Sequence, residues 1–471
     1  MTPPIVIVGA GISGLACARR LLDLTGAAGG PPPGVVLLEA APRPGGVIAT
    51  EERDGWLIEG GPDCFITDKP WAVDLCRRLG LEDAIIGTNP ALRRSFIWKR
   101  GRLVPIPEGY YLLAPARIVP FLTSPILSPA GRLRVACEVF LPRRPAPADE
   151  SLASFVRRRF GREALEWLAQ PLVAGIYNAN PESLSLRATF PRFLDLERTH
   201  RSVILGLLRG RRAAPGAGSG TSGARYGLFA TLRHGLGSLV DRLAAGLPEG
   251  ALRTGTRAVA LDRGSPPAAW IVRTDRGETI AARSLVLALP AGAAAALLRG
   301  ADPALAEMLG AIRYGGAATV SLAYARRDVP RGIQGFGFVV PRAEGRDLVA
   351  CTVSSQKFAG RAPEDGLLLR AFLPCHDPGA ADPERLEETA RREIRDLLGI
   401  TAPPILARAF AYPGALPQYT VGHLERVAGI EARLRGLPGL FLAGNGLHGI
   451  GVPDCVRSGE RAAEALAARP G

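Results

Sequence analysis

The stretch Ile5–Ala16 constrains the fold of this chain more than any other part of the sequence. An apolar, β-branched run, Ile5-Val6-Ile7-Val8, leads directly into Gly9-Ala10-Gly11-Ile12-Ser13-Gly14, and a helical pattern follows. In a strand–turn–helix of this kind Gly9 permits the tight turn, Gly11 lets backbone approach a pyrophosphate, and Gly14 lets the helix pack on the strand. The free N–H groups of the helix then face the anion. We therefore expect an α/β nucleotide-binding unit at the start of the chain.

Three further segments suit the same ligand. The run Val35–Leu38 ends in Glu39, the carboxylate expected at the tip of a second strand to accept hydrogen bonds from a ribose. Its spacing from Gly14 is longer than the usual twenty or so residues, and the Gly- and Pro-rich segment 25–34 explains this as a surface insertion. Next come Arg43 with the pair Gly45-Gly46, which suit a phosphate, and Glu59-Gly60-Gly61-Pro62-Asp63, where backbone can approach a flat ring.

Composition narrows the class of protein. A chain of 471 residues predicts two or three domains, and 47% hydrophobic residues are ample for buried cores. The net charge of +14 comes almost wholly from Arg, since Lys occurs only at positions 69, 99 and 357. This charge favours an anionic membrane surface or a carboxylate-bearing substrate, and nucleic acid is not expected as a partner. Seven scattered Cys and five dispersed His indicate neither a disulfide framework nor a metal site.

The chain resembles a known family in its two glycine loops, the Glu59–Asp63 segment and the tail, where Gly444-Asn445 ends a strand and Ile450-Gly451-Val452 begins a helix. These motifs resemble those of the monoamine-oxidase-like flavoproteins and, within them, the oxygen-dependent porphyrinogen oxidases of haem synthesis. The resemblance covers nearly the whole chain. It implies a mixed α/β fold with a Rossmann-type FAD-binding domain built from residues 1–85, 229–298 and 437–471. A helical excursion, 86–200, then binds membrane, and a sheet-containing substrate domain, 201–228 and 299–436, roofs the flavin.

The resemblance also assigns roles to residues of this chain. Backbone at Ala258 or Val259 holds the adenine, and Tyr412 lies beside the flavin ring. The helix after Gly451 places its positive N-terminal dipole at the end of the flavin where negative charge gathers on reduction. The expected cofactor-binding residues are Gly9, Ala10, Gly11, Ile12, Ser13, Gly14, Glu39, Arg43, Gly45, Gly46, Gly60, Gly61, Pro62, Asp63, Ala258, Val259, Tyr412, Gly444, Asn445, Ile450, Gly451 and Val452.

On the substrate side the resemblance implies that Gly175-Ile176-Tyr177 lines the cavity. The family usually continues this segment with Ala-Gly-Asp, whereas Asn178-Ala179-Asn180 stands here. Protoporphyrinogen oxidases commonly place an Arg before the Phe-x-aromatic strand to pair with a propionate, and that position is Ser95. Arg94 can replace this Arg if a bulge reverses the strand alternation.

The implied activity is the FAD-dependent oxidation of protoporphyrinogen IX to protoporphyrin IX. Six hydrogens leave in three flavin cycles, and dioxygen is reduced to hydrogen peroxide. Ser95 stands where protoporphyrinogen oxidases commonly have an Arg, so oxidation of coproporphyrinogen III to coproporphyrin III is the alternative activity. An amine oxidase or carotenoid desaturase would share the FAD motifs but does not predict the Gly175–Tyr177 segment, and a flavin-free lipid carrier would purify colourless. No residue is predicted as a catalytic acid or base, because hydride transfer to flavin requires none.

Basic residues far outnumber acidic ones in the segment 86–212, where apolar runs such as Ile118–Leu122 lie among Arg pairs. This pattern suits the anionic face of a membrane, with an ordinary solvated helical domain as the alternative. We expect a cytoplasmic protein held peripherally at the membrane, and a homodimer stays open. The small residues 213–224 predict a flexible loop.

Overall fold

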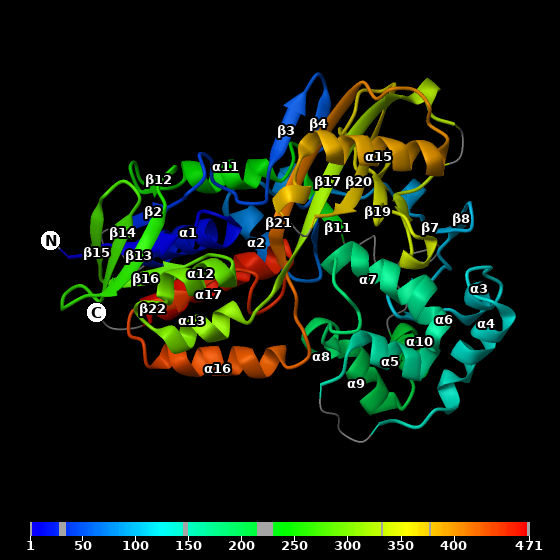
Figure 1. Ribbon diagram of the computed structural model, residues 1–471, viewed down its shortest axis with the longest axis horizontal. Coiled ribbons are helices and arrows are strands. Elements are labelled where there is room, and N and C mark those ends of the chain that lie inside the picture. Colours follow the sequence, from blue (N-terminus) through cyan, green and yellow to red (C-terminus); the bar gives the residue numbers. More distant parts are fainter. Residues whose placement is uncertain are drawn as a thin grey trace.

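The fold is described from a computed structural model, shown in Figure 1. It describes residues 2–27, 34–144, 149–213, 229–330, 333–375 and 378–468. Residues 214–224 of the expected flexible loop and 28–33 of the expected insertion lie outside these ranges. Within them, no helix is both long enough and apolar enough to cross a bilayer.

A parallel five-stranded sheet forms the centre of the first unit, on the left of Figure 1. Strands β1 and β2 are the two predicted from the opening glycine motif and from Glu39. The strands, in sheet order, are β12 (Leu252–Arg253), β2 (Val35–Leu38), β1 (Ile5–Val8), β16 (Ser284–Leu287) and β22 (Leu440–Leu442). Three distant parts of the chain thus build one sheet.

Both faces of this sheet are covered, because alternate residues of β1 point to opposite sides. Ile5 and Ile7 pack against α1 (Ile12–Ala27), α11 (Gly237–Ala245) and α17 (Val452–Ala467). Val6 and Val8 pack in a second apolar cluster with α12 (Ala291–Leu298), α13 (Pro303–Gly310) and α16 (His423–Arg435). The second cluster also holds the antiparallel strands β13 (Ala258–Arg263), β14 (Trp270–Thr274) and β15 (Thr279–Ala282).

A seven-stranded, mostly antiparallel sheet forms the second unit, at the upper right of Figure 1. Helix α15 (Pro383–Leu398), capped by Asp382, covers one face of it through Ile394 and Leu397. The strands, in sheet order, are β21 (Leu406–Pro417), β17 (Tyr314–Ala325), β20 (Gly366–Pro374), β19 (Ala350–Val353), β18 (Gly337–Val339), β7 (Ser95–Lys99) and β8 (Arg102–Pro105).

Helices make up the third part, at the lower right of Figure 1. They share one apolar core, which includes Phe155, Leu168 and Val203. They are α3 (Ile118–Leu122), α4 (Pro129–Ala136), α5 (Leu152–Phe160), α6 (Arg162–Ala164), α7 (Gln170–Tyr177), α8 (Leu186–Thr189), α9 (Pro191–His200) and α10 (Val203–Ala213), with a 3-10 turn at Cys137–Phe140 and a π-helical turn at Leu165–Ala169.

Some borders differ from the predicted domain division. Strands β7 and β8 lie within the range 86–200, yet β7 pairs with β18 and so belongs to the substrate-domain sheet. Helix α10 packs with the helical part rather than with that sheet. Helices α13 and α16 cover the first sheet, although they fall within 299–436. Each element follows the apolar surface that it buries, which a linear division of the chain does not capture.

Candidate functional site

The first glycine turn is crowded on one side and open on the other. A Cβ atom at Gly9 would lie 2.4 Å from the Ala288 carbonyl oxygen, and one at Gly14 would lie 1.9 Å from the Gly9 carbonyl oxygen. By contrast, a Cβ at Gly11 would meet no described atom within 4 Å. The backbone is therefore compact where strand and helix must touch and unobstructed where a ligand would approach, as expected for a pyrophosphate site.

The second glycine loop lies directly against the first. The Gly45 N–H donates to the Ala10 carbonyl at 2.8 Å, and a Cβ at Gly46 would lie 3.5 Å from the Gly11 Cα. Glu39 connects the loops, since its carboxylate accepts hydrogen bonds from the N–H groups of Ala10 and Ala41, each at 2.8 Å. The predicted Gly9–Gly14, Glu39 and Gly45-Gly46 motifs thus meet in space.

Arg43 was expected to contact a phosphate, but its side chain bonds to backbone carbonyls. Its guanidinium donates to the carbonyls of Pro44, Gly46 and Ile48 within its own loop. Arg43 therefore shapes the loop around Gly45 and Gly46, and a contact between Arg43 and a phosphate stays a prediction.

The expected adenine position lies at an irregularity in β13. The pairing of β13 with β14 shifts between Ala258 and Ala260, which leaves Val259 opposite no partner residue. The Val259 side chain is 50% exposed, and Val47, beside Gly46, is 40% exposed. Apolar side chains that border an uncovered backbone fit the edge of a site for a large, flat cofactor.

The Gly60–Gly61 segment is held tightly between the two sheets. The Thr319 hydroxyl donates to the Gly60 carbonyl at 2.6 Å, and the Arg370 guanidinium donates to the carbonyls of both glycines. A Cβ at Gly60 would lie 2.7 Å from the Phe410 ring, and one at Gly61 would lie 1.8 Å from the Val47 carbonyl oxygen. Only glycine fits at these two positions.

A buried charge cluster follows this segment. Lys357, in α14 (Ser354–Lys357), donates to the Asp63 carboxylate at 2.8 Å and to the Cys64 sulfur at 3.2 Å. Arg370 lies 3.9 Å from the other Asp63 oxygen. Although desolvation opposes it, the attraction of Lys357 and Arg370 holds the pKa of Asp63 well below its usual range. Burial raises the pKa of the Cys64 thiol to about 12, so this thiol stays protonated.

The lowered pKa of Asp63 predicts how its contribution to stability depends on pH. A carboxyl group whose pKa is lower in the folded state stabilises the fold fully above its unfolded-state pKa of about 4 and loses this effect as the pH falls below it. We expect Asp63→Asn to lower the free energy of unfolding at pH 7 by roughly 2–4 kcal/mol, because Lys357 would be left buried without its partner. In denaturant titrations, the difference between wild type and variant should shrink from pH 6 to pH 3. A constant difference over this range would contradict this account.

The tail forms a corner fixed by several contacts. Ser458 accepts from the Gly444 N–H at 3.0 Å, and Asn445 donates through its side chain to the Ala415 carbonyl at 3.0 Å. The Tyr419 hydroxyl donates to the Asn445 carbonyl, and its ring stacks on His423 at 4.0 Å. The corner is thereby connected to β21 and α16.

The dipole of α17 is partly offset by its own sequence. Asp454 accepts from the Gly451 N–H at 3.3 Å, and Lys69 donates to the Asp454 carboxylate at 2.7 Å. A carboxylate in the first turn counters the positive helix end. The expected effect of this dipole on a reduced flavin is therefore smaller than for an uncapped helix.

The substrate residues predicted from distant segments lie close together. Ser95 pairs with Gly337 of β18, and the Val339 side chain of the same strand lies 4.0 Å from the position of a Cβ on Gly175. Ile176, Val339 and Ile450 pack against one apolar cluster, which brings α7 and the tail corner to the same region. The segments of Ser95, Gly175–Tyr177 and Ile450 therefore converge.

Tyr177 and Asn178 lie beside this region, at the end of α7. Asn178 ends α7 in the left-handed conformation with φ 42°, which Asn tolerates, and its side chain donates to the Gly316 carbonyl at 2.6 Å. Tyr177 packs edge-on against Phe190 at 5.6 Å. Asn178 thus accommodates the turn where the family motif differs.

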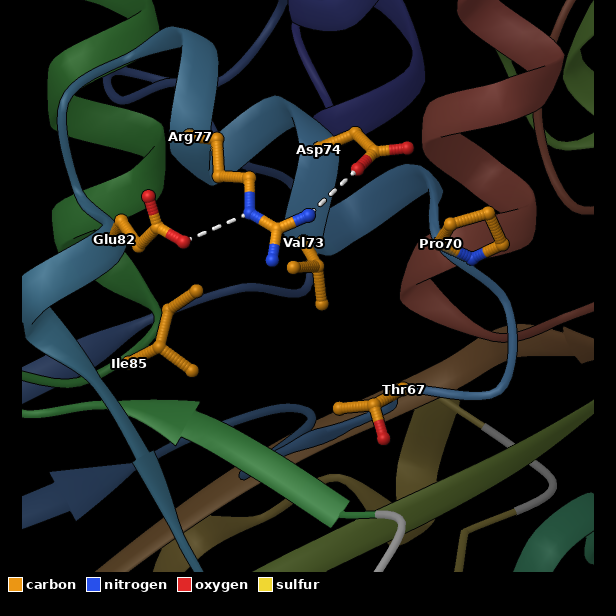
Figure 2. A pocket seen from close by; sticks show the side chains of 7 residues that line it. All are labelled: Thr67, Pro70, Val73, Asp74, Arg77, Glu82 and Ile85. Atoms are coloured by element: carbon orange, nitrogen blue, oxygen red, sulfur yellow. Dashed lines mark hydrogen bonds and ion pairs between the residues drawn. The ribbon is translucent and has the colours of Figure 1, made fainter.

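A hollow of about 460 Å³, shown in Figure 2, is separate from these residues. Arg77 lies between Asp74 and Glu82 at its wall and forms ion pairs with both. It is lined by Thr67, Pro70, Val73, Asp74, Arg77, Glu82 and Ile85, none of which is among the predicted site residues. A second hollow, of about 350 Å³, reaches Asp454 and Ser458 from the side of α16.

Comparison with known proteins identifies the family. Residues 12–467 match the model of the flavin containing amine oxidoreductases. The chain is 35% identical to the coproporphyrinogen III oxidase of Propionibacterium freudenreichii subsp. freudenreichii, over 99% of this chain and 92% of that protein. It is 31% identical to the chloroplastic protoporphyrinogen oxidase of Nicotiana tabacum, over 96% of this chain and 83% of that protein. A crystal structure from Exiguobacterium sp. 255-15, provisionally assigned as a protoporphyrinogen oxidase, superposes with a TM-score of 0.84 at 31% identity, covering 99% of both chains.

The chain therefore belongs to the flavin containing amine oxidoreductase family, and it is an FAD-dependent oxidoreductase. The described residues fit this cofactor, because Gly11 is open, the two glycine loops are in contact, and Val259 has no residue opposite it in β14. The individual cofactor contacts stay predictions. Thr319, Lys357 and Arg370 hold the Gly60–Asp63 segment, and none of them is among the residues predicted from the sequence.

Proposed function

We propose that this protein oxidises a porphyrinogen to the corresponding porphyrin in haem synthesis, with FAD as cofactor and dioxygen as the electron acceptor. The convergence of Ser95, Gly175 and Ile450 on one region carries the proposal, because these residues come from the substrate strand, the Gly-Ile-Tyr helix and the flavin-proximal tail. Relatives that act on porphyrinogens, and that cover nearly the whole chain, support it further.

The residues of this chain position the substrate and exclude water. Bound FAD would accept a hydride in each of three cycles and would pass two electrons to dioxygen, giving one hydrogen peroxide per cycle. Gly175 lies against the Val339 side chain, at 4.0 Å from its Cβ position, which brings α7 close to the strand that pairs with Ser95. The buried side chains of Tyr177 and Phe193 close the helical side of this region from solvent.

Coproporphyrinogen III is the substrate that we favour, with protoporphyrinogen IX as the second candidate. The identity to the named coproporphyrinogen III oxidase is 35%, against 31% to the named protoporphyrinogen oxidase. Ser95 is buried in β7, where the resemblance to protoporphyrinogen oxidases leads one to expect an Arg. The plant relative is named a protoporphyrinogen oxidase, and the solved structure is provisionally assigned as one, so protoporphyrinogen IX remains the second candidate substrate.

The test is aerobic turnover of the purified yellow protein, followed by porphyrin fluorescence with each porphyrinogen supplied alone. We expect turnover of both substrates, with a higher kcat/KM for coproporphyrinogen III. A higher value for protoporphyrinogen IX would reverse the order of the two candidates. Turnover of neither would overturn the proposal and return attention to amine substrates.

Arg94 is the cation that we expect to bind a substrate carboxylate. It immediately precedes β7, and its carbonyl accepts from the Phe336 N–H at 2.7 Å, next to β18. Its guanidinium forms no ion pair with the described acidic residues. Arg94→Ala should raise KM by a factor that corresponds to roughly 1.5–3 kcal/mol, the free energy of a charged hydrogen bond. Arg102→Ala, on the exposed strand β8, is the matched control, and equal kinetics for both variants would exclude Arg94 from the site.

Peripheral membrane binding is the second part of the proposal. Four large apolar side chains are exposed on neighbouring helical elements: Val119 (73%), Leu122 (41%), Leu133 (66%) and Phe140 (77%). Arg132, Arg134 and Arg143 lie in the same segment, and among the described residues they donate to backbone carbonyls rather than to carboxylates. Exposed apolar groups beside unneutralised cations suit an anionic bilayer.

Phe140→Ser is expected to weaken binding to vesicles of phosphatidylglycerol and phosphatidylcholine about tenfold or more, because the burial of a Phe side chain stabilises by about 1.5–3 kcal/mol. Vesicle co-sedimentation measures this change. Ile405→Ser, which removes another exposed apolar side chain (64%) outside the segment, should leave binding unchanged. Equal loss in both variants, or no loss in Phe140→Ser, would contradict a membrane role for this surface.

A further inference from the structure

Two residues on one face of the seven-stranded sheet each have a buried polar atom without a hydrogen-bond partner among the described residues. Arg370 is 2% exposed, and its Nε atom is buried with no hydrogen-bond partner among the described residues. The Tyr412 hydroxyl is likewise buried and lacks a partner in the described part of the chain. An unsatisfied buried donor costs free energy, so each such group requires an explanation, and a bound ligand is one.

The register of the strands places these residues on the same side. Ala317 of β17 pairs with Tyr412, and Ser321 pairs with Arg370, four residues further along β17. Thr319, between them, donates to the Gly60 carbonyl, so this side of the sheet faces the Gly60–Gly61 segment. Burial raises the pKa of the Tyr412 phenol, and the positive charges of Arg370 and Arg43 act in the opposite direction. Arg370 and Tyr412 therefore lie near each other and near the predicted flavin segments.

The surroundings of Arg370 carry an excess of positive charge. Lys357, Arg361 and Arg370 are all buried here, whereas the nearby carboxylates are Asp63 and Glu59. Lys357 pairs with Asp63, and Arg361 donates to Thr231 and to the carbonyls of Leu232 and Arg233. Buried positive charge of this kind is compensated by an anion.

We infer that Arg370 and Tyr412 bind the isoalloxazine ring of the FAD, and that the Arg370 guanidinium raises the reduction potential of the ring by stabilising the negative charge that reduction places on it. A charge near the ring nitrogens is one of the means by which a protein tunes a flavin. Asp454 partly offsets the helix dipole of α17. We therefore expect a side chain, and not this helix, to stabilise most of the negative charge on the reduced ring. The inference rests on the FAD cofactor and not on the identity of the porphyrinogen.

The test is the midpoint potential of the purified flavoprotein, measured anaerobically against a reference dye without any porphyrinogen. Arg370→Met should lower the equilibrium constant for two-electron reduction at least tenfold, a fall of about 30 mV. It should also weaken at least tenfold the binding of sulfite, which adds to oxidised flavin and leaves negative charge on the ring. Arg370→Lys should keep most of the wild-type potential and sulfite affinity, because lysine retains the positive charge. Tyr412→Phe should weaken FAD binding about threefold to tenfold, with a smaller change in potential.

Arg408→Met is the matched control. Arg408 pairs with Ser321 from the opposite neighbouring strand, so it flanks the same residue as Arg370, but its charge is neutralised by Glu51 at 2.7 Å. Its potential should equal that of wild type. An unchanged potential and sulfite affinity in Arg370→Met would overturn the inference, and a rise in KM alone would instead assign Arg370 to a substrate carboxylate. If Arg370→Met does not fold, Arg370→Gln takes its place in the same measurements, and a wild-type potential and sulfite affinity in Arg370→Gln would likewise overturn the inference.

Discussion

A Gly11→Val variant is expected to fold normally and to purify without flavin. The reason is that a Cβ at Gly11 would meet no described protein atom within 4 Å, so the substitution creates no clash within the chain itself. The same side chain would occupy the space through which the pyrophosphate approaches the backbone. The ratio of flavin absorbance to protein absorbance after purification measures the loss, and thermal unfolding of the apoprotein measures the fold.

Two other glycines provide the comparison. Gly292, in α12, also has open space around its Cβ position, and Gly292→Val should fold and keep its flavin. Gly14→Ala should fail to fold, since its Cβ would lie 1.9 Å from the Gly9 carbonyl oxygen. A yellow Gly11→Val protein with a full complement of flavin would mean that the pyrophosphate lies elsewhere.

Local patterns predicted the cofactor half of the molecule well. The run Ile5–Val8, the glycine turn and Glu39 are adjacent in sequence to the elements that position them, and β1, α1 and β2 follow as expected. Outside that half, helix α15 also carries its start signal locally, because Asp382 caps it and Pro383 occupies its first turn. In each case the information lies within about fifteen residues.

Strand β21 could not be predicted in the same way. It contains Pro413 and Pro417, which argue against a central strand because proline cannot donate to a sheet. The pairing of β17 with β21 shifts between Gly315 and Ala317, opposite the stretch that contains Pro413. As an edge strand with this irregularity, β21 accommodates both prolines. Tyr412, just before the shift, was predicted from the family resemblance rather than from strand periodicity.

The buried cations were missed because they occupy positions that read as ordinary strand or loop. Arg370 interrupts the apolar run of β20, and nothing in the sequence indicates that Gly60 and Gly61, more than 300 residues earlier, accept its hydrogen bonds. One signal was available, namely the three lysines in an arginine-rich chain. Lys69 pairs with Asp454, Lys99 lies 4.8 Å from the Trp167 ring centroid, and Lys357 pairs with Asp63. Each makes a specific contact, so rare residue types in a biased composition merit attention.

Arg159→Met is expected to destabilise the helical part strongly, because it breaks an ion pair that lies inside the core. Arg159 and Glu138 both have completely buried side chains, and the Arg159 Nε donates to the Glu138 carboxylate at 2.8 Å. Glu138 also accepts the Val203 N–H at 2.9 Å at the start of α10. Removal of Arg159 leaves this carboxylate charged and buried, which costs about 3–5 kcal/mol. Denaturant titration followed by the fluorescence of Trp167, which packs on the same core, measures the change.

The double variant Arg159→Met, Glu138→Gln separates the cost of the unpaired charge from the cost of lost packing. Gln keeps a carbonyl oxygen for the Val203 N–H but carries no charge, so the double variant should regain part of the stability lost by Arg159→Met. The exposed pair of Arg162 and Glu166 is the control, and Arg162→Met should change the titration little, since solvent screens that pair. If Arg159→Met unfolds no more readily than Arg162→Met, the buried pair does not hold α5 to α10. Because α5, α7 and α10 share one core, a loosened pair should also raise KM for the porphyrinogen, while the midpoint potential of the flavin, set in the other two units, should stay unchanged.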